Sequence, residues 1–241
     1  MSKLPVLLFV VPLYNPPADW FEQFQPFYAA FCAQASGYEH HVVFVDDGSE
    51  PAAQPPPSSA ALSFEWVQYS PNRGKGYAVR AGEAAASPGL LLFTDVDFPY
   101  EPASAARIVQ ALEAGTDVAP GIRNTSYFAH ISGFRRRLSL LHSWLIKRLF
   151  RLPISDTQCG LKGFSQNGRE LLQATTIDRF LFDLELISLA FGESNAYRVE
   201  AVEVNLRKSV QVSSVSLRVL WRELGNFLRL AWRVHVGRRM K

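Results

Sequence analysis

Two carboxylates separated by one residue, Asp95 and Asp97, follow a short apolar run over residues 89–93. Such a run predicts a buried strand, and carboxylate oxygens at the end of a strand are ligands that a divalent cation prefers. A cation held there can bridge to a diphosphate. In extended geometry we expect one side chain to bind the metal and the other, on the opposite side, to face a nucleotide or a sugar. An ordinary solvated turn can carry the same two residues, so the prediction of a metal site depends on other motifs in the chain.

The size and composition of the chain favour one large globular domain. It has 241 residues, of which 48% are hydrophobic and 20% charged. The apolar start is followed by Pro12 and Asn15 rather than by a cleavage site, so we expect a first strand and not a signal peptide. No run reaches the roughly 18 apolar residues of a spanning helix. The two cysteines, Cys32 and Cys159, predict neither a disulfide framework nor a metal site, which suits a reducing cytoplasm.

Charge is distributed unevenly along the chain. Residues 1–122 carry 5 Lys and Arg against 13 Asp and Glu, whereas residues 123–241 carry 20 against 9. An acidic half suits a metal-bound ligand, and a basic half suits a polyanion or an anionic membrane surface. A solvated face with segregated charges is the alternative. The basic half lacks a recognisable nucleic-acid-binding motif, so we expect no nucleic-acid partner.

Apolar runs alternate with helix-like segments in the first half, which predicts an α/β fold of βαβ units with a mainly parallel, Rossmann-like sheet. The expected strands cover residues 6–11, 41–45, 63–69, 90–93 and 117–119, and the expected helices cover 19–34, 76–86 and 102–114. In the second half we expect helices over 134–151 and 180–191 and a last strand over 197–206. The intervening loops fall at the carboxyl ends of strands, where such sheets bind ligands.

The end of the chain has helical periodicity with two faces. Over residues 216–236 four arginines fall on one side, and leucines, a phenylalanine and two tryptophans fill the other: Arg218, Arg222, Arg229 and Arg233 against Leu217, Leu220, Trp221, Leu224, Phe227, Leu228, Ala231 and Trp232. Such a helix can lie in a membrane interface with its arginines at lipid phosphates, or it can pack on the domain. We expect a catalytic domain over 1–210 and a membrane-interfacial amphipathic helix within 211–241.

Six collinear motifs together resemble a known family. They are Val11-Pro12-Leu13-Tyr14-Asn15, Val45-Asp46-Asp47-Gly48-Ser49, Asn72-Arg73-Gly74-Lys75-Gly76, Asp95-Val96-Asp97, residues 155–164 and Phe182-Asp183-Leu184-Glu185. The set resembles the family 2 glycosyltransferases of the GT-A fold over roughly residues 5–207. It is most similar to the polyprenyl-phosphate hexosyltransferases, which include the dolichyl-phosphate glucose and mannose synthases. The resemblance implies a GT-A domain, a nucleotide-sugar donor and a Mg²⁺ or Mn²⁺ cofactor.

The resemblance also implies a donor site on the first four motifs. Its expected residues are Pro12, Tyr14, Asn15, Asp46, Asp47, Arg73, Lys75 and Asp95. Tyr14 offers an aromatic face for stacking a base. Asp46 or Asp47 can accept a hydrogen bond from the imide of uracil or from the edge of guanine, while the other caps the adjacent turn.

The diphosphate and the metal have their own expected residues. Arg73 and Lys75 lie on a loop that opens a helix at Gly76, where positive charge and helix-terminal N–H groups can meet a diphosphate. Ordinary surface charge is the alternative for both. We expect Asp97 to bind the metal, and Asp95 to face ribose or sugar hydroxyls and to be a second candidate metal ligand. The mannose synthases carry a glutamine ligand where this chain has Pro99, so Glu101, phosphates or waters would complete the metal shell.

A lipid-phosphate acceptor requires basic residues. By resemblance Arg123 and Arg136 match the two arginines of the lipid-phosphate enzymes, and Arg207 is a third candidate. An ionised phosphate needs no general base, whereas a sugar hydroxyl would, and Asp156 is then the expected base. The expected catalytic residues are accordingly Asp97, Asp156 and Arg123. We expect Asp183 and Glu185 to orient loops or arginines, because carboxylates among apolar residues need partners.

The sequence thus predicts an inverting glycosyltransferase at the cytoplasmic face of a membrane, peripheral rather than spanning. It would move a hexose from UDP-glucose or GDP-mannose to a polyprenyl phosphate. One alternative is a family 2 transferase that acts on a sugar hydroxyl in polysaccharide or glycolipid synthesis. The other is a non-catalytic membrane- or nucleic-acid-binding protein on a lapsed transferase fold.

Overall fold

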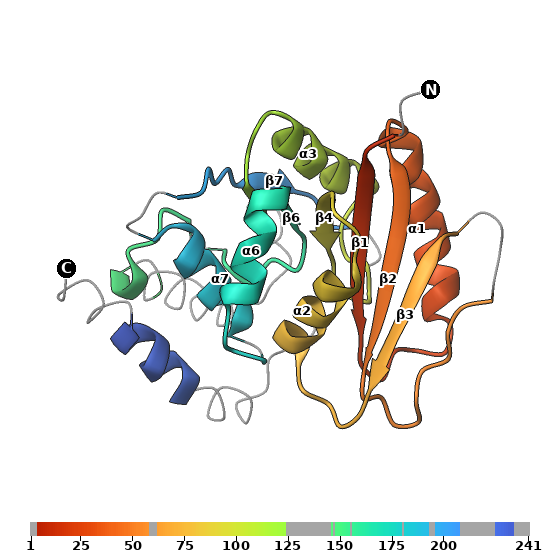
Figure 1. The fold of residues 1–241 in the computed structure, drawn as a ribbon, viewed down its shortest axis with the longest axis horizontal. Helices are drawn as coiled ribbons and strands as arrows, with labels where there is room; N and C mark the ends of the chain where they lie inside the picture. Colours follow the sequence, from red (N-terminus) through yellow and green to blue (C-terminus); the bar gives the residue numbers. More distant parts are fainter. Residues whose placement is uncertain are drawn as a thin grey trace.

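The chain folds around one mixed sheet with helices on both faces (Figure 1). The computed structural model describes residues 4–57, 62–123, 146, 148–154, 156–179, 181–192, 196–207 and 225–233. The strands are β1 (Val6–Leu13), β2 (Glu39–Asp47), β3 (Phe64–Tyr69), β4 (Leu90–Phe93), β5 (Val118–Arg123), β6 (Lys162–Phe164) and β7 (Val202–Val204). The helices with assigned bounds are α1 (Trp20–Gln34), α2 (Lys75–Ala85), α3 (Pro102–Glu113), α6 (Gln166–Ala174) and α7 (Phe182–Ala190).

Strand order and direction confirm the predicted α/β class with a mainly parallel sheet. The order is β3-β2-β1-β4-β6-β5-β7. β1 pairs in parallel with β2 and β4, and β2 pairs in parallel with β3. β6 is the exception, because it runs antiparallel between β4 and β5. The carboxyl ends of β1, β2 and β4 therefore meet at one edge of the sheet, as the motifs require.

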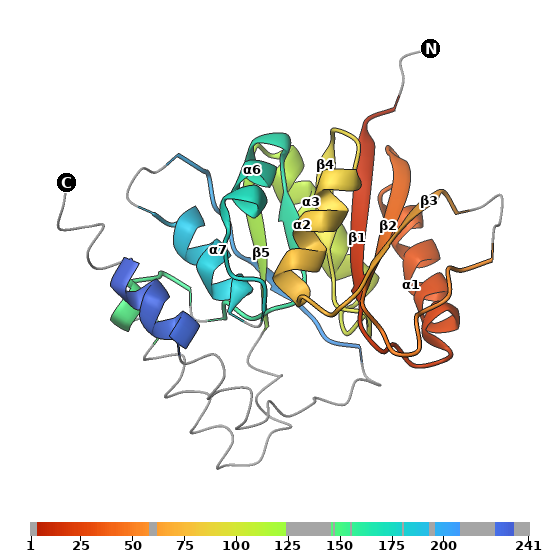
Figure 2. The same ribbon diagram turned by 60° about the horizontal axis from the view of Figure 1, so that its bottom comes forward.

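Residues on β1 alternate between two hydrophobic cores. Phe9 and Val11 face a cluster formed with α1 and α3, while Leu8 and Val10 face a cluster formed with α2, α6 and α7. Figure 2 shows the two helical layers on opposite faces of the sheet. Aromatic rings fill the first cluster, with Phe9 5.4 Å from Phe31 between ring centroids. Because both faces are covered, these strands are continuous apolar runs in the sequence.

β6 and α6 were not predicted. Residues 156–164 look like a polar loop because Lys162 and Gly163 interrupt the apolar pattern. Lys162 is nonetheless fully buried, and its ammonium lies 2.6 Å from the carboxylate of Asp183. Gly163 is required because a Cβ there would lie 2.3 Å from Ile108 on α3. Long-range contacts, rather than a local hydrophobic pattern, therefore determine this strand.

The described part of the C-terminal helix, residues 225–233, packs on the domain through part of the predicted apolar face, Phe227 and Ala231, together with Leu230, which was not placed on that face. Leu230 is buried against Phe150 and Leu184 in a third hydrophobic cluster. Leu228 and Trp232, by contrast, are 60% and 66% exposed. Arg233, expected on the lipid-phosphate face, lies 2.9 Å from the buried carboxylate of Glu185. The predicted helix over 134–151 lies mostly outside the described residues, and no described helix has the length and apolarity needed to span a membrane.

Arg169 joins α6 to the end of α2. Its guanidinium lies 3.0 Å from the Glu83 carboxylate and donates a 2.7 Å hydrogen bond to the carbonyl of Ser87. It also reaches the carbonyls of Glu83 and Ala86, so a cation satisfies the last carbonyls of a helix. Both partners of the ion pair are largely buried.

Replacing Arg169 with Met should lower the free energy of unfolding by about 3–5 kcal/mol, because the substitution leaves Glu83 as an unpaired, buried carboxylate. Urea denaturation followed by tryptophan fluorescence measures the change. The matched control is Arg229→Met on the exposed side of residues 225–233, which should change stability by no more than about 0.5 kcal/mol. Equal stability of the two variants would contradict the role of Arg169.

Candidate active site

The two aspartates after β4 lie in a turn rather than in an extended segment. The strand ends at Phe93, and the N–H of Phe98 donates a 3.1 Å hydrogen bond to the carbonyl of Asp95. Phe98 has a φ of 42°, a conformation that L residues rarely adopt, and its ring is fully buried. The expectation that the two carboxylates point to opposite sides of a strand is therefore wrong. Burial, and next the charge of Asp95, raise the pKa of Asp97, so the two carboxylates interact.

Lys75 at the start of α2 lies between two carboxylates. Its ammonium is 2.7 Å from Asp95 and 3.3 Å from Asp183. Burial alone would lower the pKa of Lys75, but the charges of Asp183 and Asp95 raise it above its ordinary value. Burial would likewise raise the pKa of Asp183, but Lys162 and Lys75 lower it. Asp183 thus has the partners that a buried carboxylate needs, but they are lysines and not the loops or arginines that we expected.

Asp46 and Asp47 at the end of β2 are both occupied by protein donors. Asp46 accepts hydrogen bonds from the N–H groups of Ser49 and Ala53 and from the Gln68 amide, at 2.8–3.1 Å. Asp47 accepts from the Asn72 side chain and from the N–H groups of residues 73 and 74, each at 2.8 Å. Asp46 therefore caps the adjacent turn through the N–H of Ser49, as expected for one of the two aspartates. Asp47 holds the loop before α2, and the expectation that one aspartate reads the base stays a prediction.

The N-terminus of α2 is likewise occupied. The N–H of Gly76 donates a 2.7 Å hydrogen bond to the carbonyl of Asp178, which also accepts from Tyr77 at 3.3 Å. A Cβ on Gly76 would lie 2.4 Å from the carbonyl of Ile177, so the chain at 177–178 seals this helix end. The expectation that helix-terminal N–H groups at Gly76 meet the diphosphate is therefore wrong. At this loop the diphosphate would have to meet side-chain cations instead.

The remaining donor-site predictions fall on the loops after β1 and before α2. Tyr14 is 52% exposed, and Pro12 beside it is half-buried. Arg73 is exposed, with its guanidinium carbon 3.4 Å from the centre of the Tyr77 ring. An exposed ring and an exposed guanidinium are therefore available to a ligand on these two loops.

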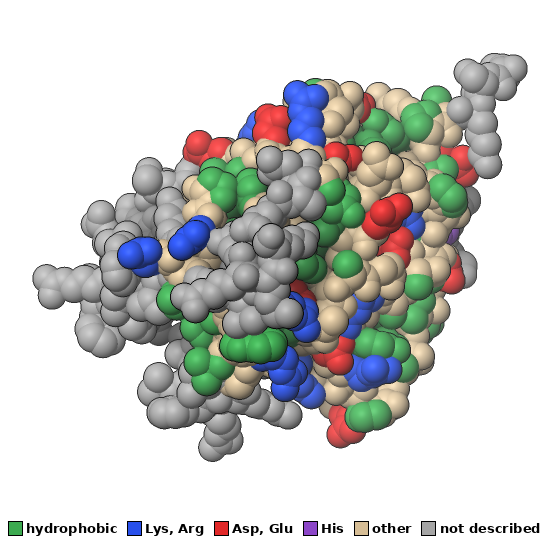
Figure 3. Space-filling model, turned by 60° about the vertical axis from the view of Figure 1, so that its left-hand side comes forward, with side chains coloured by type: hydrophobic (Ala, Val, Ile, Leu, Met, Phe, Trp, Pro, Cys, Tyr) green, Lys and Arg blue, Asp and Glu red, His purple; other side chains and the backbone are tan. Residues whose placement is uncertain are grey.

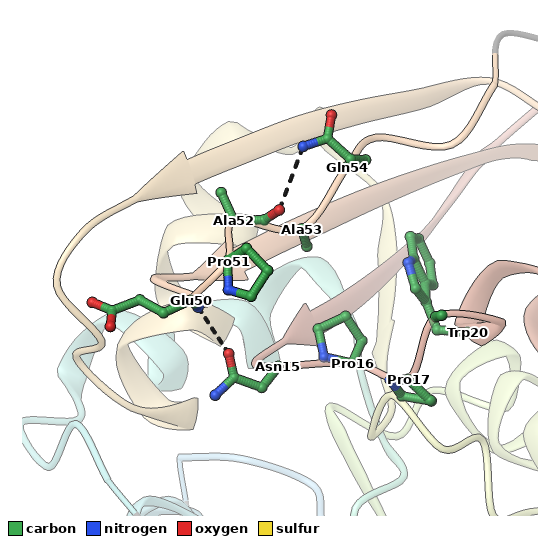
Figure 4. Close-up of a pocket in the computed structure, with 10 residues that line it drawn as sticks. Asn15, Pro16, Pro17, Trp20, Glu50, Pro51, Ala52, Ala53 and Gln54 are labelled. Atoms are coloured by element: carbon green, nitrogen blue, oxygen red, sulfur yellow. Dashed lines mark hydrogen bonds between the residues drawn. The ribbon is translucent and has the colours of Figure 1, made fainter.

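Asn15 ties the loop after β1 to the loop after β2. Its N–H donates to the Ser49 hydroxyl at 2.8 Å, and its side-chain oxygen accepts from the N–H of Glu50 at 2.9 Å. Between the loops lies a pocket of about 350 Å³, shown in Figure 4. It is lined by Asn15, Pro16, Pro17, Ala18, Trp20, Glu50, Pro51, Ala52, Ala53 and Gln54. Only Asn15 among the predicted site residues lines it, so the pocket borders the predicted donor site and is not its charged centre.

Arg123 and Asp156 bind each other. From the sequence, Arg123 was expected to bind a lipid phosphate, and Asp156 to act as base on a sugar hydroxyl. The guanidinium of Arg123 donates hydrogen bonds of 2.8 and 2.6 Å to the two carboxylate oxygens of Asp156, and the Arg123 N–H adds a third of 2.8 Å. Such a bidentate pair is among the stronger polar contacts in proteins. Both oxygens of Asp156 are engaged, so a role as general base would require this pair to open.

Arg207 lies against the turn that carries Asp95 and Asp97. Its guanidinium donates a 2.8 Å hydrogen bond to the carbonyl of Asp97, and its N–H donates to the carbonyl of Pro99 at 2.8 Å. Its charge also opposes the rise in the pKa of Asp97. Arg207 would therefore lie close to a metal or a phosphate bound at Asp97. Arg136 lies outside the described residues.

The donor atoms at this turn fit a divalent cation. Asp95 and Asp97 supply carboxylate oxygens, which Mg²⁺ and Mn²⁺ prefer. A cationic group, the Lys75 ammonium, already sits at 2.7 Å from Asp95. The described residues hold no cluster of three or more His, Cys, Asp or Glu side chains that could hold a metal ion. Mg²⁺ is commonly bound by one or two carboxylates, with phosphate oxygens and water in the rest of its shell, and the two aspartates of this turn fit that pattern.

Comparison with known proteins decides the family. A profile described as "Glycosyl transferase family 2" matches residues 9–169, about two thirds of the chain. The chain belongs to this family. It is therefore a glycosyltransferase, as the six motifs predicted. The matched region contains the site residues described above except residues 177–178, the carboxylates of α7 and Arg207.

Curated relatives of this transferase carry related names. A dolichyl-phosphate beta-glucosyltransferase of Drosophila melanogaster is 29% identical over 92% of this chain and 73% of its own length. An undecaprenyl-phosphate 4-deoxy-4-formamido-L-arabinose transferase of Edwardsiella ictaluri is 31% identical over 68% of this chain and 51% of its own length. The chain thus spans only about half of that bacterial relative. The names are consistent with the predicted class of polyprenyl-phosphate transferases.

Solved structures show the same fold. Mannosyl-3-phosphoglycerate synthase from Rubrobacter xylanophilus aligns with a TM-score of 0.63 at 16% identity, over 95% of this chain and 73% of its own. A mannosyltransferase from Pyrobaculum calidifontis, solved with GDP-Man and Mn²⁺, aligns with a TM-score of 0.53 at 16% identity, over 92% of this chain and 61% of its own. The predicted GT-A fold is confirmed.

Several residues that shape the site were not foreseen. Gly160 packs so closely on Asp95 that a Cβ there would lie 1.6 Å from a carboxylate oxygen, and its N–H donates to the Tyr100 hydroxyl at 2.9 Å. Lys162 and the carbonyl of Asp178 are the others. The only available signal was the glycine-containing segment 155–164, because the contacts themselves are long-range.

Gly160→Ala should weaken binding of Mn²⁺ by the transferase at least about tenfold, because the added methyl group must displace the Asp95 carboxylate. Titration of Mn²⁺ followed by electron paramagnetic resonance measures the free ion. Gly225→Ala is the matched control, since nothing lies within 4 Å of a Cβ at that position. Unchanged Mn²⁺ affinity in Gly160→Ala would show that Asp95 does not hold the ion.

Proposed function

We propose that this transferase moves a hexose from a nucleotide sugar to a polyprenyl phosphate, with inversion at the anomeric carbon. The proposed donors are UDP-glucose and GDP-mannose. Relatives named as dolichyl-phosphate and undecaprenyl-phosphate transferases support the acceptor class. The name of the Drosophila melanogaster relative favours a glucose donor, whereas the GDP-Man complex of the Pyrobaculum calidifontis structure keeps the mannose donor in the proposal.

One observation carries this proposal: donor-type and acceptor-type groups gather around the turn after β4. Asp95 contacts Lys75 from α2, and Arg207 after β7 contacts Asp97. The segment 156–160 joins the two sides, because Asp156 at its start binds Arg123 and Gly160 at its end packs on Asp95. A diphosphate and a second phosphate can therefore be bound within one neighbourhood.

On the donor side, the chain supplies carboxylates and cations for different parts of the nucleotide sugar. Mg²⁺ or Mn²⁺ bound by Asp95 and Asp97 would supply charge neutralisation of the departing diphosphate. Arg73 and Lys75 are the side chains available to bind phosphate oxygens on the α2 side. Tyr14, exposed on the neighbouring loop, would stack on the base. These groups together would hold the sugar in one position, so that its anomeric carbon is oriented for attack.

On the acceptor side, arginines would hold the lipid phosphate. An oxygen of the phosphate monoester attacks the anomeric carbon, and the bond from that carbon to the diphosphate breaks as the new bond forms. The attacking phosphate is already ionised at neutral pH, so no proton has to be removed. Arg123 and Arg207 are the described candidates for binding it, with Arg136 as the third. Asp156 holds the Arg123 guanidinium by two hydrogen bonds, so the phosphate would replace this carboxylate as its partner.

Transfer of radiolabelled sugar tests the reaction directly. With UDP-glucose or GDP-mannose, Mg²⁺ or Mn²⁺, and undecaprenyl or dolichyl phosphate, label should enter the organic phase with one of the donors. Asp97→Ala should reduce it at least about 100-fold, because a metal contributes several kcal/mol to leaving-group stabilisation. Arg123→Gln should reduce transfer by a similar factor, whereas Asp156→Asn should retain activity within about tenfold.

The opposite ranking of the last two variants would favour a hydroxyl acceptor. Loss of activity in Asp156→Asn with little effect of Arg123→Gln would identify Asp156 as a base. The control is Glu203→Gln, an exposed side chain on β7, which should transfer at the wild-type rate. Absence of label with both donors, together with measurable nucleotide-sugar binding, would refute the lipid-phosphate acceptor.

We also infer that the transferase binds the cytoplasmic face of a membrane through its C-terminal helix. The exposed Leu228 and Trp232 are four residues apart, so they lie on one face of residues 225–233. Arg229 lies beside them. Figure 3, which brings this side of the molecule forward, shows Lys and Arg side chains next to apolar ones. Apolar side chains with neighbouring cations suit the interface of an anionic membrane.

The double variant Leu228→Ser, Trp232→Ser should bind vesicles that contain phosphatidylglycerol at least about tenfold more weakly, because two apolar side chains no longer enter the bilayer. Sedimentation with vesicles measures the bound fraction. Leu4→Ser removes another exposed leucine, 53% accessible, and should leave binding unchanged. If both variants bind like the wild type, residues 225–233 are not the membrane contact.

A further inference from the structure

Four charged side chains of alternating sign form a continuous row beneath the metal-binding turn. They are Asp95 after β4, Lys75 at the start of α2, Asp183 in α7 and Lys162 in β6. The successive distances between charged atoms are 2.7, 3.3 and 2.6 Å. The side chain of Lys162 is fully buried and that of Asp183 is 4% exposed, whereas Lys75 and Asp95 are 26% and 37% exposed. The row therefore runs from the solvent-accessible site into the core.

The inner half of the row is fixed by the cost of burying charge. An isolated charge in the core is strongly unfavourable, so Lys162 and Asp183 must remain paired. The Lys162 ammonium also donates to the carbonyl of Cys159, which holds it in one position. Asp183 thus binds Lys162 with one oxygen and presents its other oxygen to Lys75.

The outer half of the row is not fixed in the same way. Lys75 has the shorter contact with Asp95, which is the more exposed of its two partners. Asp95 is also a proposed metal ligand. Its Oδ1 binds the ammonium and its Oδ2 packs on Gly160, so a divalent cation at this carboxylate would lie close to the ammonium and repel it. Arrival of the metal must therefore weaken this ion pair, while Asp183 still holds Lys75 close to its present position.

We propose that Lys75 is a built-in counter-ion that competes with the divalent metal for Asp95, and that Asp183 is the positioning residue that holds Lys75 ready for the donor. This inference rests on the proposed function, because it assumes a metal and a diphosphate at the turn. Without ligands the ammonium neutralises Asp95. With metal and donor bound, Asp95 would hold the metal, and the ammonium of Lys75 would bind the diphosphate.

The proposal predicts opposite effects for two variants of neighbouring residues. In Lys75→Met the competitor is lost, so Mn²⁺ alone should bind about three- to tenfold more tightly, while UDP-glucose or GDP-mannose should bind more weakly with Mn²⁺ present. In Asp183→Asn the lysine loses its inner partner and pairs fully with Asp95. Mn²⁺ alone should then bind about three- to tenfold more weakly.

Each variant has a control of the same charge change elsewhere on the surface. Arg198→Gln also removes one positive charge, and Glu203→Gln also removes one negative charge, both at exposed positions. These controls should leave the affinity for Mn²⁺ within about twofold of the wild type, since exposed, distant charges are screened by salt. Electron paramagnetic resonance of free Mn²⁺ measures the metal alone, and calorimetry measures the nucleotide sugar, so neither depends on turnover.

A double variant guards against misfolding. If Asp183→Asn does not fold because Lys162 is left unpaired, Asp183→Asn with Lys162→Met removes both inner charges and still leaves Lys75 with Asp95 as its sole carboxylate partner in the row. It should show the same weaker binding of Mn²⁺. The double variant keeps the net charge of the wild type and both aspartates of the turn, so its change in affinity for Mn²⁺ reports on Lys75.

The outcomes separate this inference from the proposed function. Tighter binding of Mn²⁺ in Lys75→Met, with weaker binding in Asp183→Asn or the double variant, supports it. Weaker or unchanged binding in Lys75→Met overturns it, since the lysine would then support the turn rather than compete with the metal. A wild-type protein that binds neither Mn²⁺ nor a nucleotide sugar would overturn the proposed function and the inference together.

Discussion

The buried ion pair between Lys162 and Asp183 constrains the second half of the fold. A lysine in the middle of a sheet needs a carboxylate at close range, so α7 must dock where Asp183 can reach β6. Docking of α7 also places Glu185, whose carboxylate binds the N–H groups of residues 176 and 177, as expected for a carboxylate that orients a loop. That loop in turn seals the start of α2. The need to neutralise one buried lysine thus links the core to the start of α2, where Lys75 lies.

Local sequence pattern predicted the first half of the fold well. The expected strand over 90–93 has the bounds of β4, and the strands before it differ from prediction by a few residues at their ends. These segments are apolar on both faces because helices cover both sides of the sheet, which gives a strong signal. β6 and α6 gave no such signal. A three-residue strand that contains a buried lysine and a glycine depends on partners far away in sequence, and no local pattern reveals them.

The candidate site also has a part that local sequence predicts and a part that it does not. Residue type and spacing selected the aspartates of the turn, the cations before α2 and the arginines, but they did not show which of these groups are already engaged. Asp47 binds a loop that begins 25 residues later, Arg123 binds a carboxylate 33 residues away, and the carbonyl of Asp178 occupies an N–H that lies 102 residues earlier. Such pairings depend on the tertiary fold, so sequence reasoning could give the chemistry of the site but not its internal contacts.

Two of the proposed phosphate-binding cations are held by carboxylates of the protein itself. Lys75 lies between Asp95 and Asp183, and Arg123 is bound in bidentate fashion by Asp156. A cation held in this way has already lost much of its side-chain freedom, so an incoming phosphate need not meet the full ordering cost. In the proposed reaction the phosphate replaces a carboxylate as the partner of the cation, so the cation itself stays paired. This exchange also favours anionic ligands over neutral ones, because a hydroxyl group offers no charge to replace that of Asp156.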